Sequence, residues 1–396
     1  AELNLNFSLL GISNIDSRNQ AYSLFEYGGR LAFTFHQFLF PLSPDFNEKI
    51  NLLNPRTRLS FYYNYEDRTK EYERNQIFSD FSYLWSQNRK KQFIFTPFGI
   101  NYTEIRQIDQ SFQAFLDAQD ALGNRSLSAA FKPSLTTLIS FEAIINQNNY
   151  GNLSSKSSLL RLLTESGGLY VNAFENLLPD SNFNLFKWLK FNIDFRSHMI
   201  SEKGQIAFKI NFGAAYAYGD AQALPYERRF YAGGSNSIRA WPVRRLGPGA
   251  YGEISTLNHT FTEDEVAQID YQREQGGDLI IETSLEYRNK LTTNINYAIF
   301  VDIGNIWLLN GNQSIKDYEG DNGVFRFNSF YKELAMGIGL GLRYDFSFMI
   351  LRLDGAVQVV DPAQPEGKRY VFNQLISQNR VFRNKSNINI GIGLPF

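Results

Sequence analysis

The sequence contains no cysteine and only three histidines among its 396 residues. Without cysteine the chain can form neither a disulfide framework nor a metal site built on thiolates. The histidine, aspartate and glutamate residues show no metal-ligand spacing, and the Gly-x-Ser-x-Gly turn that presents a nucleophilic serine in many hydrolases does not occur. We therefore predict that the protein has no metal, no cofactor and no enzymatic activity.

A surplus of positive charge is also missing. The 39 basic and 40 acidic residues give a net charge of −1, and no basic stripe is visible. Proteins that bind nucleic acids usually carry such a surplus or stripe, because they must neutralise phosphates. We therefore expect no nucleic-acid partner.

Long apolar runs are absent too, and a membrane-spanning helix needs about 18 apolar residues or more. An apolar stretch such as residues 296–309 is interrupted by Asp302, Gly304 and Asn305. A membrane span is then possible only as a closed β-barrel, because lipid offers no partner for unpaired backbone groups. The mean hydropathy of −0.32 is compatible with a barrel, since half of each strand faces a polar lumen.

What the sequence does contain is alternation with a period of two. Apolar Ile206, Phe208 and Ile210 alternate with Ala207 and Lys209, and other segments repeat this pattern. Such alternation predicts strands with one apolar and one polar face. We predict strands near residues 3–10, 25–39, 56–66, 74–87, 91–105, 134–147, 158–172, 184–198, 204–219, 278–288, 295–305, 335–346, 348–360 and 386–396.

This all-β pattern predicts a transmembrane antiparallel β-barrel. Single-chain bacterial barrels have even strand numbers, and we expect sixteen strands, with further strands in residues 10–25 or 105–135. Residues 110–125 fit either a short helix or an ordinary extracellular loop, and the loop is favoured. Tyrosines and tryptophans near strand ends, among them Tyr83, Trp188 and Trp307, predict aromatic girdles at the membrane interfaces.

A long segment of about residues 220–277 shows little alternation, and a gap of this length in a compact fold is usually functional. It contains the run YERRFYAGGSNSIRAWPVRRLGPG at residues 226–249. This run resembles the sixth extracellular loop of the BamA/TamA superfamily of outer-membrane insertases. The matching residues are Phe230, Tyr231, Gly233, Gly234, Ile238, Arg239 and Trp241.

The sequence departs from the family at Ala240, where glycine is usual, and alanine tolerates a positive φ poorly. The resemblance continues in order through residues 283–288, 300–307, 339–345 and 351–354, and the chain ends on the aromatic Phe396. The stretch Asp361-Pro362-Ala363 and the strands rich in Asn and Phe are similar to the TamL-like branch of Bacteroidetes.

The resemblance implies that this loop folds into the barrel lumen, where Arg239 meets acidic residues of the inner wall at Glu286 and Asp302. Strand parity agrees, because Leu285, Tyr287, Val301 and Ile303 fall on the opposite face. A guanidinium group has a planar fork of donors that pairs with two carboxylate oxygens at once. Gly233 and Gly234 would permit a tight turn before the tip.

The last predicted strand shows the clearest alternation. Its apolar residues are expected to face lipid: Ile388, Ile390, Ile392, Leu394 and Phe396. Glycine and proline on the other parity weaken a strand and favour an edge. The resemblance implies a seam between the first and last strands that opens sideways and templates a substrate strand. The same residues could instead serve only as the signal for the chain's own insertion.

We therefore expect a bacterial outer-membrane factor for protein assembly or translocation. Its expected partners are outer-membrane lipids, nascent outer-membrane or secreted polypeptides, and periplasmic or lipoprotein accessory subunits. The alternatives are a polypeptide transporter of the two-partner-secretion type, a porin-like channel and a barrel hydrolase. Residues 1–396 are expected to form one barrel domain without periplasmic POTRA modules. Because no secretion signal opens the chain, we expect a processed chain or a part of a larger protein.

Overall fold

The structure is a computed structural model. It describes residues 2–11, 22–39, 53–69, 71–121, 128, 131–147, 156–170, 185–219, 223–251, 274–309, 323–346, 348–372 and 385–396. No helix among them is long and apolar enough to cross a membrane. The chain divides into two compact units, described separately below: residues 1–146, 160–192 and 215–228 form the first, and residues 147–159, 193–214 and 229–396 the second.

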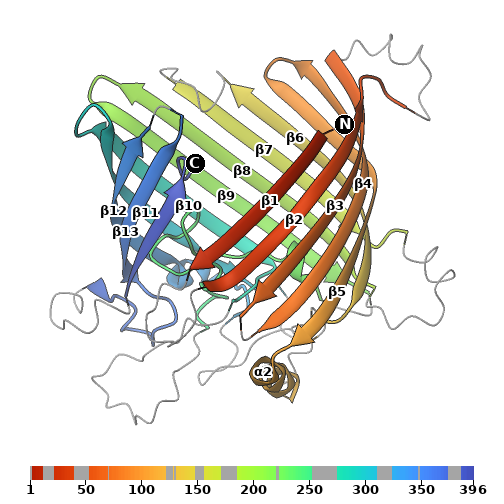
Figure 1. Cartoon of the computed structure of the whole chain (residues 1–396). Coiled ribbons are helices and arrows are strands. Elements are labelled where there is room, and N and C mark those ends of the chain that lie inside the picture. Colours follow the sequence, from red (N-terminus) through yellow and green to blue (C-terminus); the bar gives the residue numbers. More distant parts are fainter. Residues whose placement is uncertain are drawn as a thin grey trace. The chain divides into compact units, whose positions relative to one another are not determined.

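The described residues contain fourteen strands, which follow one another in chain order within one sheet (Figure 1). Adjacent strands run antiparallel, as the register of β2 with β3 illustrates. The strands before the long loop are β1 Glu2–Gly11, β2 Tyr22–Phe35, β3 Leu53–Arg68, β4 Tyr72–Asn88, β5 Lys91–Ile108, β6 Ser134–Gln147, β7 Lys156–Gly167, β8 Lys187–Ser201 and β9 Gly204–Tyr218. After it come β10 Leu279–Lys290, β11 Ile295–Trp307, β12 Ala335–Asp345, β13 Ile350–Val360 and β14 Ser386–Ile392.

Each of the fourteen segments predicted from alternation overlaps one of these strands. The count of sixteen is not confirmed, since the described residues hold fourteen strands and residues 12–21 lie outside them. Closure of the sheet into a barrel stays a prediction. For residues 110–125 the sequence favours a loop over a short helix, but the structure has a helix there: α2 spans Gln110–Ala121 beyond the end of β5 (Figure 1). The described residues also contain two short 3-10 helices, η1 Tyr226–Arg228 and η3 Phe330–Glu333.

Along the strands, apolar side chains are exposed and charged side chains are buried, the reverse of a soluble protein. In β10 the side chain of Leu285 is 51% exposed, whereas its neighbour Glu286 is fully buried. In β9 Ile206 and Ile210 are exposed while Lys209 is buried. An exposed apolar face and a covered polar face are what a strand needs when lipid lies on one side of it. We call the side that carries Glu286 the polar face.

The predicted aromatic girdle is wrong at three of its positions. Trp188, Trp307 and Tyr83 are buried rather than exposed at an interface. Each has a partner for its polar atom: Trp188 Nε1 donates to Glu165 at 2.7 Å, Trp307 Nε1 to Glu333 at 2.6 Å, and the Tyr83 hydroxyl to the Leu39 carbonyl at 2.8 Å. Indole and phenol groups can be buried when their polar atoms are paired, and sequence position alone does not reveal such a partner.

An aromatic cluster in the first unit holds the chain where it leaves β9. Phe112 of α2 packs edge-on against Phe131 with ring centroids 5.1 Å apart. Phe131 in turn contacts Tyr72 at 5.0 Å and Tyr226 at 5.6 Å. The cluster fixes η1, which is the first described element after β9.

Candidate functional site: the Arg239 loop

The second unit contains the part of the long loop that carries the family-like motif. Residues 229–251 are described, whereas residues 252–273 lie outside the described part of the chain. Phe230 and Gly277 form an antiparallel bridge in which each N–H donates to the other's carbonyl at 2.8 Å. Ala232 and Leu246 form a second bridge. These bridges close the base of a hairpin-like loop, which we call the Arg239 loop, residues 229–251.

Gly233 and Gly234 make the turn ahead of the tip. Their φ angles are 102° and 95°, a left-handed conformation that residues with a side chain rarely adopt. A Cβ on Gly233 would lie 2.3 Å from the Pro242 carbonyl oxygen. The N–H of Gly234 donates to the Trp241 carbonyl at 2.9 Å, which brings the two arms of the loop together. Both glycines are therefore required by the backbone path of this turn.

The guanidinium group of Arg239 lies on the polar face of β10 and β11 and is 1% exposed. Its Nε donates to Asp302 Oδ2 at 2.8 Å and its Nη2 to Asp302 Oδ1 at 2.9 Å, while Nη1 donates to Glu286 Oε2 at 2.6 Å. The backbone N–H of Arg239 also donates to Asp302, at 3.1 Å. The structure thus brings together the three residues that the sequence singled out, and their functional role stays a prediction.

Arg239 also stacks on an aromatic ring. Its guanidinium carbon lies 3.3 Å from the centre of the Phe300 ring, a cation–π contact. On β12 Gly339 leaves the room for that ring, because a Cβ there would come 2.2 Å from Phe300. The sequence placed Phe300 on the same parity as Asp302 without a reason for an apolar residue there. The stack of guanidinium on ring supplies that reason.

Three further arginines surround the same carboxylates. Glu286 accepts from Arg288 Nε at 2.7 Å and from Arg343 Nη2 at 3.0 Å. Asp354 on β13 pairs with Arg343, and its Oδ2 lies 3.4 Å from Arg352 Nε. Four arginines therefore share three buried carboxylates, Glu286, Asp302 and Asp354.

The charge state of Arg239 follows from this network. Burial would lower the pKa of its guanidinium, but the hydrogen bonds and attraction of Asp302 and Glu286 raise that pKa above its ordinary value. Arg239 therefore stays charged around neutral pH, and its attachment to the sheet does not depend on its own titration.

The tip of the Arg239 loop is bound to the last strand by side-chain amides. Asn387 Nδ2 donates to the carbonyl oxygens of Arg239 and Trp241, both at 3.1 Å, and Asn389 Nδ2 donates to the Arg239 carbonyl at 2.9 Å. These contacts hold β14 by its polar face, apart from its backbone ladder to β13. The sequence placed both asparagines on this face but gave no signal for their partners.

The apolar face of β14 is the most exposed in the second unit among the strand residues described. Ile388, Ile390 and Ile392 are 69%, 73% and 76% exposed, and Leu394 is exposed as well. Phe396 departs from the predicted face, because it is buried under Arg288, whose guanidinium carbon lies 5.5 Å from the ring centre. The strand ends at Ile392, and Gly393 has a φ of 82° that breaks the alternation. Arg288 Nη2 also donates to the Phe396 carbonyl at 3.2 Å.

The remaining motif residues pack around the tip. Ile238 and Trp241 are fully buried, and Phe230 nearly so. Tyr231 lies under Arg244, whose guanidinium carbon is 5.0 Å from the ring centre.

Ala240 does not have a positive φ, so its departure from the family glycine does not strain the backbone. Its methyl group instead faces Gly337 of β12, where a Cβ would lie 2.6 Å from it. The absence of a side chain at Gly337 therefore leaves the space that the Ala240 methyl group occupies.

A second set of contacts, which the sequence did not predict, fixes the arm before the tip. Glu282 accepts from Lys209 Nζ at 2.6 Å and from the Ser237 hydroxyl at 2.6 Å. Lys209 also donates to the Asn236 backbone carbonyl at 2.9 Å. Lys209 on β9 and Glu282 on β10 both lie on the polar face, and the apolar–polar alternation of these strands predicts that position but not their pairing.

Comparison with known proteins identifies the family. The model of the Omp85 superfamily domain matches residues 1–396. The chain therefore belongs to the Omp85 superfamily. A search of curated proteins gave no match.

Three solved structures are similar to the chain. A crystal structure of BamA from Haemophilus ducreyi lacking POTRA domains 1–3 is 16% identical, with a TM-score of 0.59 over 84% of this chain and 59% of that one. CdiB from Acinetobacter baumannii (11% identity, TM-score 0.37, 91% and 62% of the two chains) and CdiB from Escherichia coli (8%, 0.40, 91% and 64%) are also matched. The chain thus spans about three fifths of these proteins' length. The BamA match shows a shared all-β fold.

Proposed function

We propose that this chain is the membrane-embedded part of a bacterial outer-membrane factor that inserts or translocates other polypeptides, acting without covalent chemistry. Membership of the Omp85 superfamily supports this kind of function. The exposed apolar face of strands such as β9 and β10 supports a lipid environment. The partners in this proposal are outer-membrane lipids, client polypeptides and accessory subunits.

We further propose that the Arg239 loop governs the last strand. The observation that carries this step is the set of hydrogen bonds from Asn387 and Asn389 to the backbone of the loop tip. The loop is itself fixed to the sheet by buried ion pairs. It therefore gives β14, the last strand of the sheet, a rigid support. A strand held by its side chains can exchange backbone partners while keeping its place, which is what templating of a client strand requires.

Cysteine cross-linking tests the proposal directly, because the native chain has no cysteine that could interfere. A single cysteine replaces Ile390 on the exposed face of β14, and a matched control replaces Ile299, which is 50% exposed within β11. A client barrel with one cysteine in its terminal strand is folded in the presence of each variant. We expect cross-links at position 390 and a several-fold lower yield at position 299. Equal yields at both positions would contradict templating at β14.

The transporter alternative predicts a different product. In proteoliposomes an insertase leaves its client in the bilayer, folded and resistant to protease, whereas a transporter releases its client into the aqueous compartment. Recovery of soluble client across the membrane, without cross-links at position 390, would support the transporter and overturn the insertase.

A further inference from the structure

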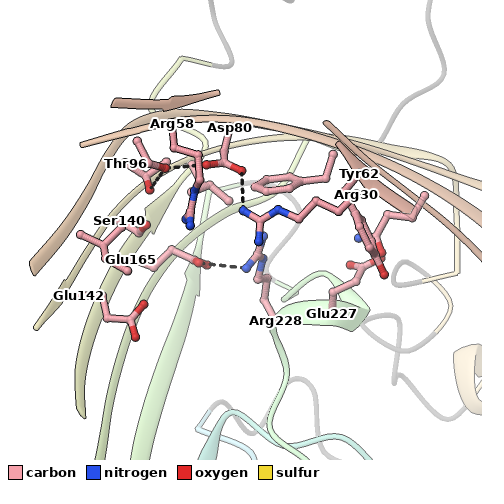
Figure 2. Close-up of a pocket in the computed structure, with 15 residues that line it drawn as sticks. Arg30, Arg58, Tyr62, Asp80, Thr96, Ser140, Glu142, Glu165, Glu227 and Arg228 are labelled. Atoms are coloured by element: carbon pink, nitrogen blue, oxygen red, sulfur yellow. Dashed lines mark hydrogen bonds and ion pairs between the residues drawn. The ribbon is translucent and has the colours of Figure 1, made fainter. Parts of the chain in front are cut away.

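The first unit contains a hollow of about 380 Å³ on the polar face of β2–β7 (Figure 2). We call it the Arg58 hollow. Glu227 and Arg228 of η1 line the side of the hollow opposite the sheet. Its floor consists of short hydroxyl side chains, including Ser82, Thr96 and Ser140, next to the larger Phe78 and Leu138. The hydroxyls of Ser82 and Thr96 bond to each other at 2.8 Å. Short side chains in adjacent strands leave the space, and a volume of this size lies within the range of small-ligand sites.

Three guanidinium groups point toward one another in this hollow: Arg58 and Arg30 reach in from the sheet, and Arg228 from η1 (Figure 2). Arg30 is close enough to repel Arg58 electrostatically. Like charges gathered in a partly buried site raise the free energy of the protein unless anions balance them.

Each carboxylate that lines the hollow is already paired with an arginine other than Arg58. Asp80 lies 3.9 Å from Arg30, and Glu165 accepts from Arg228 at 3.0 Å. The other two pair with arginines outside the lining, Glu227 with Arg74 at 2.9 Å and Glu142 with Arg161.

Arg58 is the cation left over from this pairing. It has no hydrogen bond or ion pair within the part of the chain that the structure describes, and its Nε is buried without a partner. Asp80, Glu2 and Glu142 attract it only from beyond ion-pair distance. Of the three arginines that line the hollow, Arg58 is therefore the one without a paired carboxylate, and the carboxylate of a ligand would supply that partner.

We propose that the Arg58 hollow is a binding site for a carboxylate group, held by the fork of Arg58 and flanked by Arg30 and Arg228. Guanidinium binds carboxylate through two parallel hydrogen bonds, which gives both strength and orientation. The apolar Phe78, Ile94 and Leu138 in the lining suit the methylene groups next to such a carboxylate. The carboxylate belongs either to a small organic acid or to an acidic side chain of a bound polypeptide. This site does not depend on the proposed function.

Binding is measured by ligand-observed NMR on the full protein in detergent with three probes. The probes are butyrate, a blocked pentapeptide with one Glu among glycines, and the same peptide with Gln in place of Glu. Each carries ¹³C next to its carboxylate or side-chain amide. We expect a carboxylate probe to bind and the Gln peptide to bind at least tenfold more weakly. Binding of butyrate alone assigns the site to small acids, and binding of the Glu peptide assigns it to polypeptides. Equal binding of the two peptides, or no binding of any probe, overturns the proposal.

Variants locate the binding in the hollow. Arg58→Gln is expected to weaken carboxylate binding about tenfold or more, because a charged, bidentate partner is lost. Arg58→Lys keeps the charge without the fork and is expected to fall between Arg58→Gln and the native protein. Arg89→Gln, in the exposed turn between β4 and β5, is the control and should bind like the native protein. Native affinity in both Arg58 variants would contradict the proposal, and the comparison of Glu and Gln peptides tests it even if one variant does not fold.

Discussion

Arg239 in the second unit donates a hydrogen bond from every nitrogen of its guanidinium group, whereas Arg58 in the first unit donates none among the described residues. Both are surrounded by other arginines and by carboxylates. Around Arg239 the carboxylates point at the guanidinium and complete its coordination. Around Arg58 they are used by other cations, and an open space remains. A completed network fixes the protein's own chain, and an incomplete one leaves a place for a ligand.

This comparison predicts that substitution of Arg239 lowers the stability of the folded protein strongly, whereas substitution of Arg58 hardly changes it. Buried charges are strongly destabilising when one partner is removed, and the cost is about 3–5 kcal/mol. An arginine without partners has no such interaction to lose.

The largest effect is expected for Arg239→Glu. The substitution leaves Asp302 and Glu286 unpaired and adds a third negative charge beside them, so the loop can no longer dock. We expect the stability of the folded protein to fall by about 3–5 kcal/mol, seen as a lower temperature of unfolding on heated gels. Lys290→Glu at the exposed end of β10 is the control, because no ion pair of Lys290 is found among the described residues, and it should unfold near the native temperature. Native heat resistance of Arg239→Glu would show that the ion pairs do not hold the loop.

A smaller loss is expected for Gly337→Ala, which forces a methyl group against Ala240. Overpacking of this kind costs about 1–3 kcal/mol. The double variant Ala240→Gly/Gly337→Ala restores the space and should recover most of the stability. If the double variant is as unstable as Gly337→Ala alone, the two residues are not in the contact described here.

Asn387→Ala removes the two hydrogen bonds that β14 donates to the loop tip. We expect a cost of about 1–2 kcal/mol, because two buried neutral hydrogen bonds are lost. Denaturant unfolding measures the change. Asn296→Ala is the matched control, since Asn296 lies on β11 and no side-chain hydrogen bond is found for it in the described chain. A loss of the same size in both variants would mean that the effect is not due to the loop.

The smallest effect on stability is expected for Arg58→Gln. No hydrogen bond or ion pair within the described residues is lost, so the free energy of unfolding should change by no more than about 0.5 kcal/mol. The comparison would break down if this substitution were as destabilising as Arg239→Glu, because Arg58 would then be a structural residue.

The strands were predictable because lipid on one side and polar contacts on the other impose strict parity, as in Leu285 and Glu286. The contacts of Arg239 with Glu286 and Asp302 could be anticipated from that parity together with the resemblance in the loop. Other features depend on how the loop folds back. Asn387 and Asn389 receive their partners from residues about 150 positions earlier, and Phe396 leaves its expected face because Gly393 turns the chain. The Arg58 hollow gave no signal, since an arginine on a polar face looks the same whether or not it has a partner.

Hydrogen exchange in β14 tests most directly the claim that the Arg239 loop holds the last strand. The amides of residues 388–392 are compared between the native protein and the variant Asn387→Ala/Asn389→Ala, with β10 as an internal reference. Loss of three hydrogen bonds predicts at least about tenfold faster exchange in β14, with β10 unchanged. Exchange in β14 at the native rate would contradict the claim.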